Sequence, residues 1–279
     1  MSGGFAFVTG GASGLGRGVA QMLVKNDIKV FIVDRDLEGA QKVVDELGSQ
    51  MARCAQVDVA NWNSQVKAFS QAVADFGRID YVYPIAGIGE RAWIPNDPSM
   101  TGFVQPDLSV LDIDLTGVFY TVALAVQQFR KQQPGKDGFR GKIGTVASVC
   151  GFYTCPTLPV YTAAKHGVVG LVRSYGKYLP EEKITFNAVC PNVIRTNISA
   201  ATFYDQLDKE GLLSPIEGVI GVFESLLGSN ATSGETFEIG PNYKEQGAVV
   251  RKGIEYLDKE SERCFELLYH RSRPLHQPR

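Results

Sequence analysis

Short apolar runs alternate along the chain with longer stretches whose apolar residues recur every three or four positions. The run at residues 5–9 has the length of a buried parallel strand, whereas the spacing of Val19, Met22 and Leu23 is that of a helix. Strands are predicted over residues 5–9, 29–33, 52–57, 79–85, 142–147, 184–190 and 236–239. Helices are predicted over residues 14–26, 36–47, 62–76, 106–133, 160–179 and 216–227. This alternation predicts a single α/β domain, with a doubly wound parallel sheet of about seven strands and helices on both faces.

Three segments do not follow this alternation. Residues 87–105 are rich in Pro, Gly and Asn and are predicted to form a loop that borders a ligand site, and residues 195–215 have the mixed composition of a mobile lid. Residues 243–269 have helical spacing and could cover the site or join a partner subunit, and the polar tail from Arg271 is expected to be disordered or lightly docked. We therefore divide the chain into a catalytic domain, residues 1–240, and a C-terminal helical extension and tail, residues 241–279.

Composition excludes several classes of function. The chain has 279 residues, is 44% hydrophobic and carries a formal net charge of −2, so it shows no bias toward nucleic acid or an anionic membrane. Five scattered cysteines without a CxxC pair argue against a disulfide framework and against a zinc site, so no metal is expected. No secretory signal is apparent, and no apolar run reaches the roughly 18 to 20 residues of a membrane span. A cytoplasmic protein is the expectation.

Three glycines lie in the turn between the first predicted strand and the first helix, in the motif TGGASGLG at residues 9–16. Glycine permits a positive φ and lets the backbone approach a pyrophosphate, to which the helix N-terminus offers free N–H groups. A tight turn without a ligand is the alternative, but the strand before it and the helix after it favour a dinucleotide site of the Rossmann type. The residues expected to contact the cofactor here are Gly10, Ser13, Gly14, Leu15 and Gly16.

An acidic residue, Asp34, ends the second strand eighteen residues beyond Gly16. A carboxylate there can accept hydrogen bonds from both adenosine ribose hydroxyls and repel a 2′-phosphate, which favours NAD over NADP. Arg35 follows and could partly counter that repulsion; a solvated strand-end carboxylate is the alternative for Asp34. After the third strand, Asp58 and Val59 could meet the adenine edge, although Asp58 could equally be an ordinary helix cap.

Tyr161 and Lys165 stand four residues apart on a predicted helix, and therefore on one face of it. Hydride transfer requires proton transfer at the substrate oxygen. A tyrosine can perform it if its pKa, about 10 when free, falls, and a nearby ammonium favours the phenolate. Lys165 would also be free to bond the nicotinamide ribose, and Ser148, at the end of the fifth strand, can position the substrate oxygen. A surface pair and a turn residue are the alternatives, but the glycine turn upstream favours a nicotinamide-dependent oxidoreductase.

Together these residues resemble the short-chain dehydrogenase/reductase family over residues 5–239. The segment 191–196 is similar to the family segment that wraps the nicotinamide carboxamide. The resemblance implies further cofactor contacts from Ala86, Gly87, Tyr161, Lys165, Pro191, Val193, Ile194 and Thr196. Within the family, residues 159–170 are similar to the NAD-dependent 15-hydroxyprostaglandin dehydrogenase type. That similarity implies oxidation of a secondary alcohol to a ketone in a homodimer; a homotetramer is the other expected assembly.

Three positions depart from the family pattern. Pro84 and Ile85 stand where the family has two asparagines, which removes amides that stabilise the central strands. Asp114 stands where the family has an asparagine that holds a water near the catalytic lysine, and we count it with Ser148, Tyr161 and Lys165 as a candidate catalytic residue. If its carboxylate lies near Lys165, it should raise the lysine pKa. Asn192 replaces a glycine, which is a mild change because asparagine tolerates left-handed backbone.

The leading hypothesis is NAD-dependent oxidation of a secondary alcohol on a bulky hydrophobic small molecule, such as a terpenoid, steroid, lipid or polyketide. The apolar residues of the two irregular segments would line its pocket, or alternatively form a dimer interface or cap the core. They are Trp93, Ile94, Phe103, Ile198, Phe203, Tyr204, Leu207, Leu212 and Leu213. The competing hypothesis is a family scaffold with a non-redox role, either a ligand-binding module or a cofactor-retaining isomerase or cyclase.

Overall fold

Eight strands form one sheet in the computed structural model of the chain, which describes residues 3–276. The strands are β1 (Phe5–Thr9), β2 (Lys29–Asp34), β3 (Ala52–Gln56), β4 (Tyr81–Pro84), β5 (Gly141–Val146), β6 (Ile184–Pro191), β7 (Thr236–Ile239) and β8 (Val249–Val250). Their order is β3-β2-β1-β4-β5-β6-β7-β8, and only β8 runs antiparallel to its neighbour. The predicted parallel sheet is confirmed, with one short strand added at its edge.

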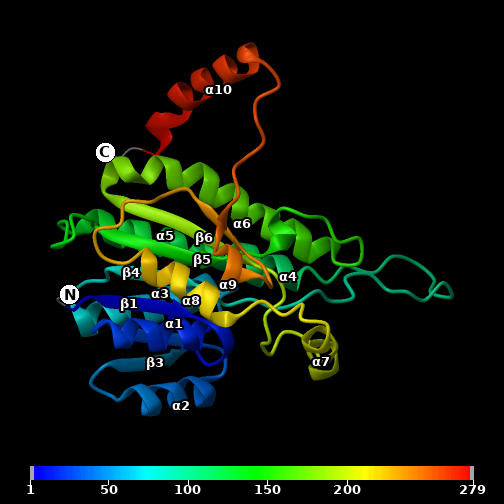
Figure 1. Cartoon of the computed structure of the whole chain (residues 1–279), viewed down its shortest axis with the longest axis horizontal. Coiled ribbons are helices and arrows are strands. Elements are labelled where there is room, and N and C mark those ends of the chain that lie inside the picture. The colour runs from blue at the N-terminus through cyan, green and yellow to red at the C-terminus, as the bar shows by residue number, and fades with distance from the viewer. Residues whose placement is uncertain (1–2, 277–279) are drawn as a thin grey trace.

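Helices cover both faces of this sheet (Figure 1). They are α1 (Gly14–Lys25), α2 (Leu37–Leu47), α3 (Trp62–Phe76), α4 (Ser109–Leu111), α5 (Gly117–Lys131), α6 (Pro159–Tyr178), α7 (Ala201–Lys209), α8 (Ile216–Ser225), α9 (Tyr243–Gln246) and α10 (Lys259–Ser272). Successive side chains of a strand point to opposite faces, so Phe7 and Phe31 pack with α3, α5 and α6, whereas Val8 and Ile32 pack with α1, α2 and α8. The result is the doubly wound Rossmann-like domain that the sequence predicts.

The helix predicted over residues 106–133 contains an irregularity. It starts at Ser109, and α4 and α5 are joined by a π-helical segment, η1 (Asp112–Thr116), in place of regular α-helix. π-segments inside α-helices are rare and often occur at functional sites. By length and composition the combined helix Ser109–Lys131, of mean hydropathy 1.6, could cross a bilayer, contrary to expectation. It packs against β4, β5 and α3, however, and the core helix of a globular domain meets the same criterion.

The C-terminal extension differs from the helix predicted there. Val249 lies in β8, and Ile254 and Leu257 lie in a non-helical stretch where their side chains are fully exposed. Helix α10 begins only at Lys259, because the Asp258 carboxylate caps it by accepting a hydrogen bond from the Ser261 N–H at 2.7 Å. Figure 1 shows α10 standing away from the sheet beyond α6.

The predicted tail from Arg271 is ordered as far as the structure describes it. Arg271 and Ser272 end α10, and η4 (Arg273–Leu275) follows as a 3₁₀ turn. Arg273 bonds Glu181 at 2.7 Å, so this end of the extension is docked on the main domain. Residues 277–279 of the predicted tail lie outside the described residues.

The two irregular segments flank the same edge of the domain. Residues 85–108 carry no regular secondary structure and extend outward as a long arm (Figure 1). The predicted lid, 195–215, contains the short helix α7. The two segments contact each other at Gly89 and Ile198. A Cβ on Gly89 would lie 3.1 Å from the Ile198 side chain.

Candidate active site

The glycine turn follows β1 directly and lies against the end of β2. The N–H groups of Gly10 and Gly11 both donate to the Val33 carbonyl, at 2.8 and 3.3 Å. Gly10 and Gly14 have φ values of +70° and +51°, in the left-handed region that favours glycine. Ser13 is the N-cap residue of α1, but its side chain makes no capping hydrogen bond, and the first turn of α1 has no acidic residue. The start of α1 is therefore suited to an anion.

Two of the glycines are required by close backbone approach. A Cβ on Gly10 would lie 2.7 Å from Cα of Ala86, and a Cβ on Gly16 would lie 2.1 Å from the Gly10 carbonyl oxygen. Such distances are too short for any side chain, so the turn closes as a concave cradle only with glycine at both positions. The residues present thus fit a dinucleotide pyrophosphate.

Asp34 is held at the end of β2 with its carboxylate directed to the glycine turn. Its Oδ2 accepts a hydrogen bond from the Ala12 N–H at 3.1 Å, and its Oδ1 accepts one from the Asp36 N–H at 3.0 Å. The structure therefore brings this carboxylate to the cradle, whereas the Arg35 side chain is exposed. These hydrogen bonds argue against the alternative for Asp34, which was a freely solvated carboxylate at the end of the strand.

Threonine hydroxyls hold the end of β4 and the loop after it, where Pro84 and Ile85 stand in place of two asparagines of the family pattern. Thr9 Oγ1 accepts hydrogen bonds from the N–H groups of Ile85 and Ala86, at 3.0 and 3.1 Å. Thr145 Oγ1 donates to the Pro84 carbonyl at 2.7 Å. These contacts tie β4 to its neighbours β1 and β5, so the loss of the two amides leaves the strands connected.

The segment 191–196 reaches the cradle through Thr196. A Cβ on Gly14 would lie 3.5 Å from Cγ2 of Thr196. Pro191 ends β6, Val193 is partly buried, and the Ile194 side chain is 7% exposed within the core on the α8 side. Any contact of Ile194 with a cofactor would therefore use its backbone.

Of the pair expected near the adenine, Asp58 is exposed and Val59 is buried against Gly117. The helix-cap alternative for Asp58 is wrong: the N-cap of α3 is Asn61, whose side chain accepts from the Ser64 N–H at 2.9 Å. Asp58 Oδ1 instead accepts from the Ala60 N–H and shapes the turn before α3.

Ser148, Tyr161 and Lys165 come together at the ends of β5 and the start of α6. Lys165 Nζ lies 5.2 Å from the centre of the Tyr161 ring, as their spacing on one helical face predicts. Ser148 is 8% exposed, and its hydroxyl accepts a hydrogen bond from the Cys150 N–H at 3.1 Å. The Ser148 hydroxyl also acts to lower the pKa of Tyr161.

Asp114 is the fourth member of this cluster. It lies on η1 with no solvent exposure, and its Oδ2 is 3.0 Å from Lys165 Nζ. Burial opposes the charged ammonium of Lys165, but the attraction of Asp114, followed by that of Tyr161, outweighs it and raises the pKa of Lys165. The expected effect of Asp114 on the lysine is thus present. Lys165 is thus paired with a carboxylate, which engages one of the three N–H donors of its ammonium.

The Lys165 ammonium acts on Tyr161 in the expected direction, but other effects outweigh it. Burial raises the pKa of Tyr161, the Lys165 ammonium lowers it, and the Asp114 carboxylate raises it again. The net direction is upward, because burial is the largest of these effects and Asp114 counters the lysine.

Glu90 belongs to the same site and was not among the predicted residues. Its Oε2 accepts a hydrogen bond from the Tyr161 N–H at 2.7 Å and so caps the first turn of α6, 71 residues along the chain. A carboxylate at a helix N-terminus is stabilising. Local sequence patterns give no signal for a cap supplied from so far away.

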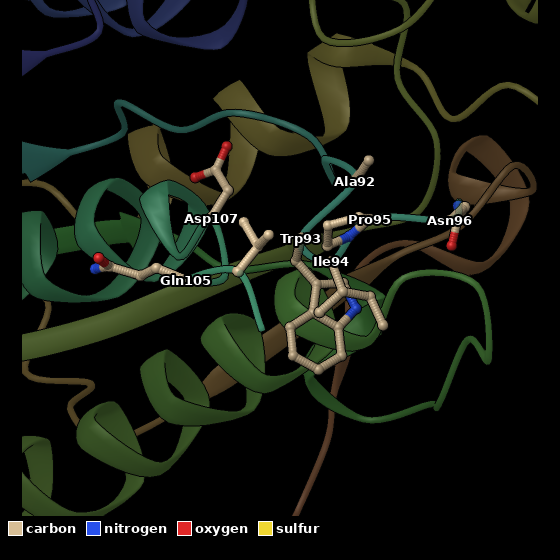
Figure 2. Close-up of a pocket in the computed structure, with 8 residues that line it drawn as sticks. Ala92, Trp93, Ile94, Pro95, Asn96, Gln105 and Asp107 are labelled. Carbon is tan, nitrogen blue, oxygen red and sulfur yellow. The ribbon is translucent and has the colours of Figure 1, made fainter. Parts of the chain in front are cut away.

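A hollow of about 400 Å³ lies within the arm formed by residues 85–108. Its two sides are joined by the hydrogen bond from the Asp107 N–H to the Trp93 carbonyl at 2.9 Å. The Trp93 and Ile94 side chains project to the same side of the loop (Figure 2). Its lining residues are Ala92, Trp93, Ile94, Pro95, Asn96, Val104, Gln105 and Asp107. None of them belongs to the Ser148–Tyr161–Lys165 cluster.

The other apolar residues expected to line a substrate pocket fall into three groups, of which Leu207 and Leu213 form the partly buried one. Ile198, Phe203 and Leu212 are roughly half exposed, and Phe103 is fully exposed. Tyr204 is buried instead, with its hydroxyl 3.2 Å from Thr196 Oγ1, so it supports the segment beside the glycine turn. Among residues 3–276, no group of three or more His, Cys, Asp or Glu side chains is placed to hold a metal ion.

The chain is similar to known proteins over most of its length. A sequence model described as short chain dehydrogenase matches residues 4–207. Carbonyl reductase family member 4 of Xenopus laevis is 31% identical over 202 residues, which cover 72% of this chain and 80% of that protein. Cyclohexanol dehydrogenase of Acinetobacter sp. (strain SE19) is 29% identical over 252 residues, covering 88% and 95%.

A solved structure extends the similarity to the fold. The 3-ketoacyl-(acyl-carrier-protein) reductase of Brucella melitensis, complexed with NADH, superposes with a TM-score of 0.73 at 24% identity. The match covers 85% of this chain and 97% of that one. The C-terminal extension follows the region that the family's sequence model matches.

Proposed function

The chain belongs to the short-chain dehydrogenase family of oxidoreductases, and from this premise we propose that it oxidises a secondary alcohol to a ketone with NAD as its cofactor. The observation that carries the proposal is the cluster of Ser148, Tyr161 and Lys165 at the same sheet edge as the glycine cradle and Asp34. Parallel strands end together at this edge, so one extended ligand can reach both.

The cradle and the residues around it would hold NAD. The amides of the glycine turn and the start of α1 suit its pyrophosphate, and Asp34 suits the adenosine ribose. A 2′-phosphate would meet the Asp34 carboxylate, which supports NAD over NADP. NAD, when bound, supplies the acceptor for the hydride that leaves the alcohol carbon.

The chain's own residues handle the substrate proton. Ser148 donates a hydrogen bond to the substrate oxygen and orients it. Tyr161, in its phenolate form, accepts the hydroxyl proton. Lys165 stabilises that phenolate electrostatically. The raised pKa of Tyr161 implies that oxidation accelerates as the pH rises into the alkaline range, because the reactive phenolate becomes more abundant.

For the substrate we propose a bulky hydrophobic alcohol. Half-exposed apolar side chains stand on both segments that flank the sheet edge, Trp93 and Ile94 on one and Ile198 and Phe203 on the other. Such surfaces suit a terpenoid, steroid, lipid or polyketide. The similarity of residues 159–170 to the 15-hydroxyprostaglandin dehydrogenase type supports the oxidative direction. We further propose a homodimer or homotetramer, which light scattering of the purified protein would test.

The test is a panel of secondary alcohols of increasing bulk, each incubated with the protein and either NAD or NADP. We expect the absorbance of reduced nicotinamide to grow with NAD and a bulky alcohol, and to grow much more slowly with NADP. Turnover that prefers NADP would remove the role assigned to Asp34. Alcohol binding without any change in nicotinamide absorbance would instead indicate the non-redox role.

A further inference from the structure

The carboxylate of Asp114 joins three parts of the active site. It is carried by η1, the π-helical segment, and is fully buried. Its Oδ1 accepts a hydrogen bond from the Ile88 N–H at 2.8 Å, and its Oδ2 lies 3.0 Å from Lys165 Nζ. It therefore connects the loop after β4, the interrupted helix and the catalytic face of α6.

The fit around this carboxylate is close. A Cβ on Gly87 would lie only 3.0 Å from Asp114 Oδ2, so the glycine leaves room for the acid. The next residue of η1, Leu115, packs against Gly167 of α6. A Cβ on Gly167 would lie only 2.7 Å from the Leu115 side chain. Position 114 is thus held relative to α6 by packing as well as by charge, and an uncharged side chain of the same shape would occupy the same place.

The remaining titratable groups around Lys165 do not replace Asp114. From η2 (Val149–Gly151) comes Cys150, and from β6 comes Cys190; burial raises the pKa of both thiols, that of Cys190 to about 12, so both are neutral at ordinary pH. From the loop after β4, Glu90 bonds the backbone of Tyr161. His166, beside Lys165 on α6, is exposed and bonds the Thr162 carbonyl.

We propose that Asp114 is a positioning residue that sets the working pH of this site: its carboxylate balances the ammonium of Lys165, so that alcohol oxidation requires a more alkaline medium than an amide at position 114 would allow. This inference rests on the proposed function. Asp114 acts through Lys165, since the ammonium can favour the Tyr161 phenolate fully only when no carboxylate offsets it.

The test compares Asp114→Asn with Asp112→Asn. Both positions lie on η1, but Asp112 is exposed, so the second variant controls for the loss of one acidic residue from this segment. With NAD and an alcohol substrate, we expect the rise of kcat with pH to move about one unit or more toward lower pH in Asp114→Asn, and to stay in place in Asp112→Asn.

A second readout needs neither substrate nor cofactor. Ultraviolet titration of tyrosinate is recorded for the wild type and for Asp114→Asn, each with and without Tyr161→Phe, so that the difference isolates Tyr161. We expect this difference to appear at lower pH in the Asp114→Asn background. Asp114→Ser, which keeps an oxygen able to accept from Ile88, repeats the comparison if the first variant unfolds.

The outcomes separate the two proposals. If no alcohol is oxidised but the Tyr161 titration moves as expected, the proposed function fails and the role of Asp114 stands. If kcat falls equally at every pH and the tyrosinate titration is unchanged, Asp114 is only structural and the inference is overturned.

Discussion

The two ends of the proposed active site differ in the kind of interaction that holds their residues in place. At the nucleotide end, backbone atoms make the contacts: Gly10 and Gly11 bond the Val33 carbonyl, and Asp34 is held by two main-chain N–H groups. At the chemical end the contacts are between buried polar side chains, with Lys165 close to both Tyr161 and Asp114. The shape of the nucleotide end depends on the space available to the backbone. The chemistry of the other end depends on a balance of charges, which a single substitution of Asn for Asp would alter.

The sharpest test of this contrast removes only the phenol hydroxyl. We expect Tyr161→Phe to reduce kcat by about 10² to 10⁴-fold, because the proton acceptor is lost. NAD affinity, measured by calorimetry, should hardly change, since the glycine cradle is untouched. Tyr153→Phe is the matched control: Tyr153 is exposed on the neighbouring loop, with its hydroxyl bonded to Glu238. Substantial turnover by Tyr161→Phe would show that the proton acceptor is another group.

At the nucleotide end the corresponding change adds a single methyl group. Gly16→Ala places a Cβ 2.1 Å from the Gly10 carbonyl oxygen, so we expect an unfolding free energy lower by about 1–3 kcal/mol and a strong loss of NAD affinity. Gly170→Ala is the control, because nothing lies within 4 Å of its added Cβ on the exposed side of α6. Denaturant unfolding and calorimetry measure both effects. A Gly16→Ala protein that binds NAD as tightly as the wild type would contradict the cradle.

A charge change at the nucleotide end should alter selectivity without abolishing turnover. We expect Asp34→Ala to reduce the preference for NAD over NADP by about tenfold, which corresponds to about 1.4 kcal/mol, as the repulsion of the 2′-phosphate disappears. The ratio of kcat/KM values for the two cofactors is the measurement. Asp45→Asn, on the surface of α2, serves as the control. An unchanged ratio would mean that Asp34 supports the turn but does not read the ribose.

The smallest expected effect concerns the contact between Glu90, on the loop after β4, and the first turn of α6. Glu90→Ala removes the acceptor of the Tyr161 N–H, and we expect the unfolding free energy to fall by about 1 kcal/mol, as for other helix caps. Glu90→Gln keeps an acceptor oxygen and should recover most of that loss. Equal destabilisation by the two variants would assign the stabilisation to the negative charge and not to the hydrogen bond.

Much of the proposed nucleotide end could be predicted from the sequence, because the residues that form it lie close together in the chain or on neighbouring strands. The period of apolar residues predicts the strands, and β1, β7 and α3 start and end at the predicted residues. Likewise, the three glycines and the acidic residue eighteen positions later lie at the ends of adjacent parallel strands, whose carboxyl ends necessarily meet at one edge.

The sequence by itself therefore determined the sheet, the glycine turn and the shared face of Tyr161 and Lys165, since each follows from spacing along one or two neighbouring elements. Only the tertiary structure decided the distance from Asp114 to Lys165, the cap from Glu90 and the threonine contacts that replace the missing asparagines. These contacts join residues far apart in the chain. The combined effect of Asp114 and Lys165 on the pKa of Tyr161 also depends on burial, which no local pattern specifies.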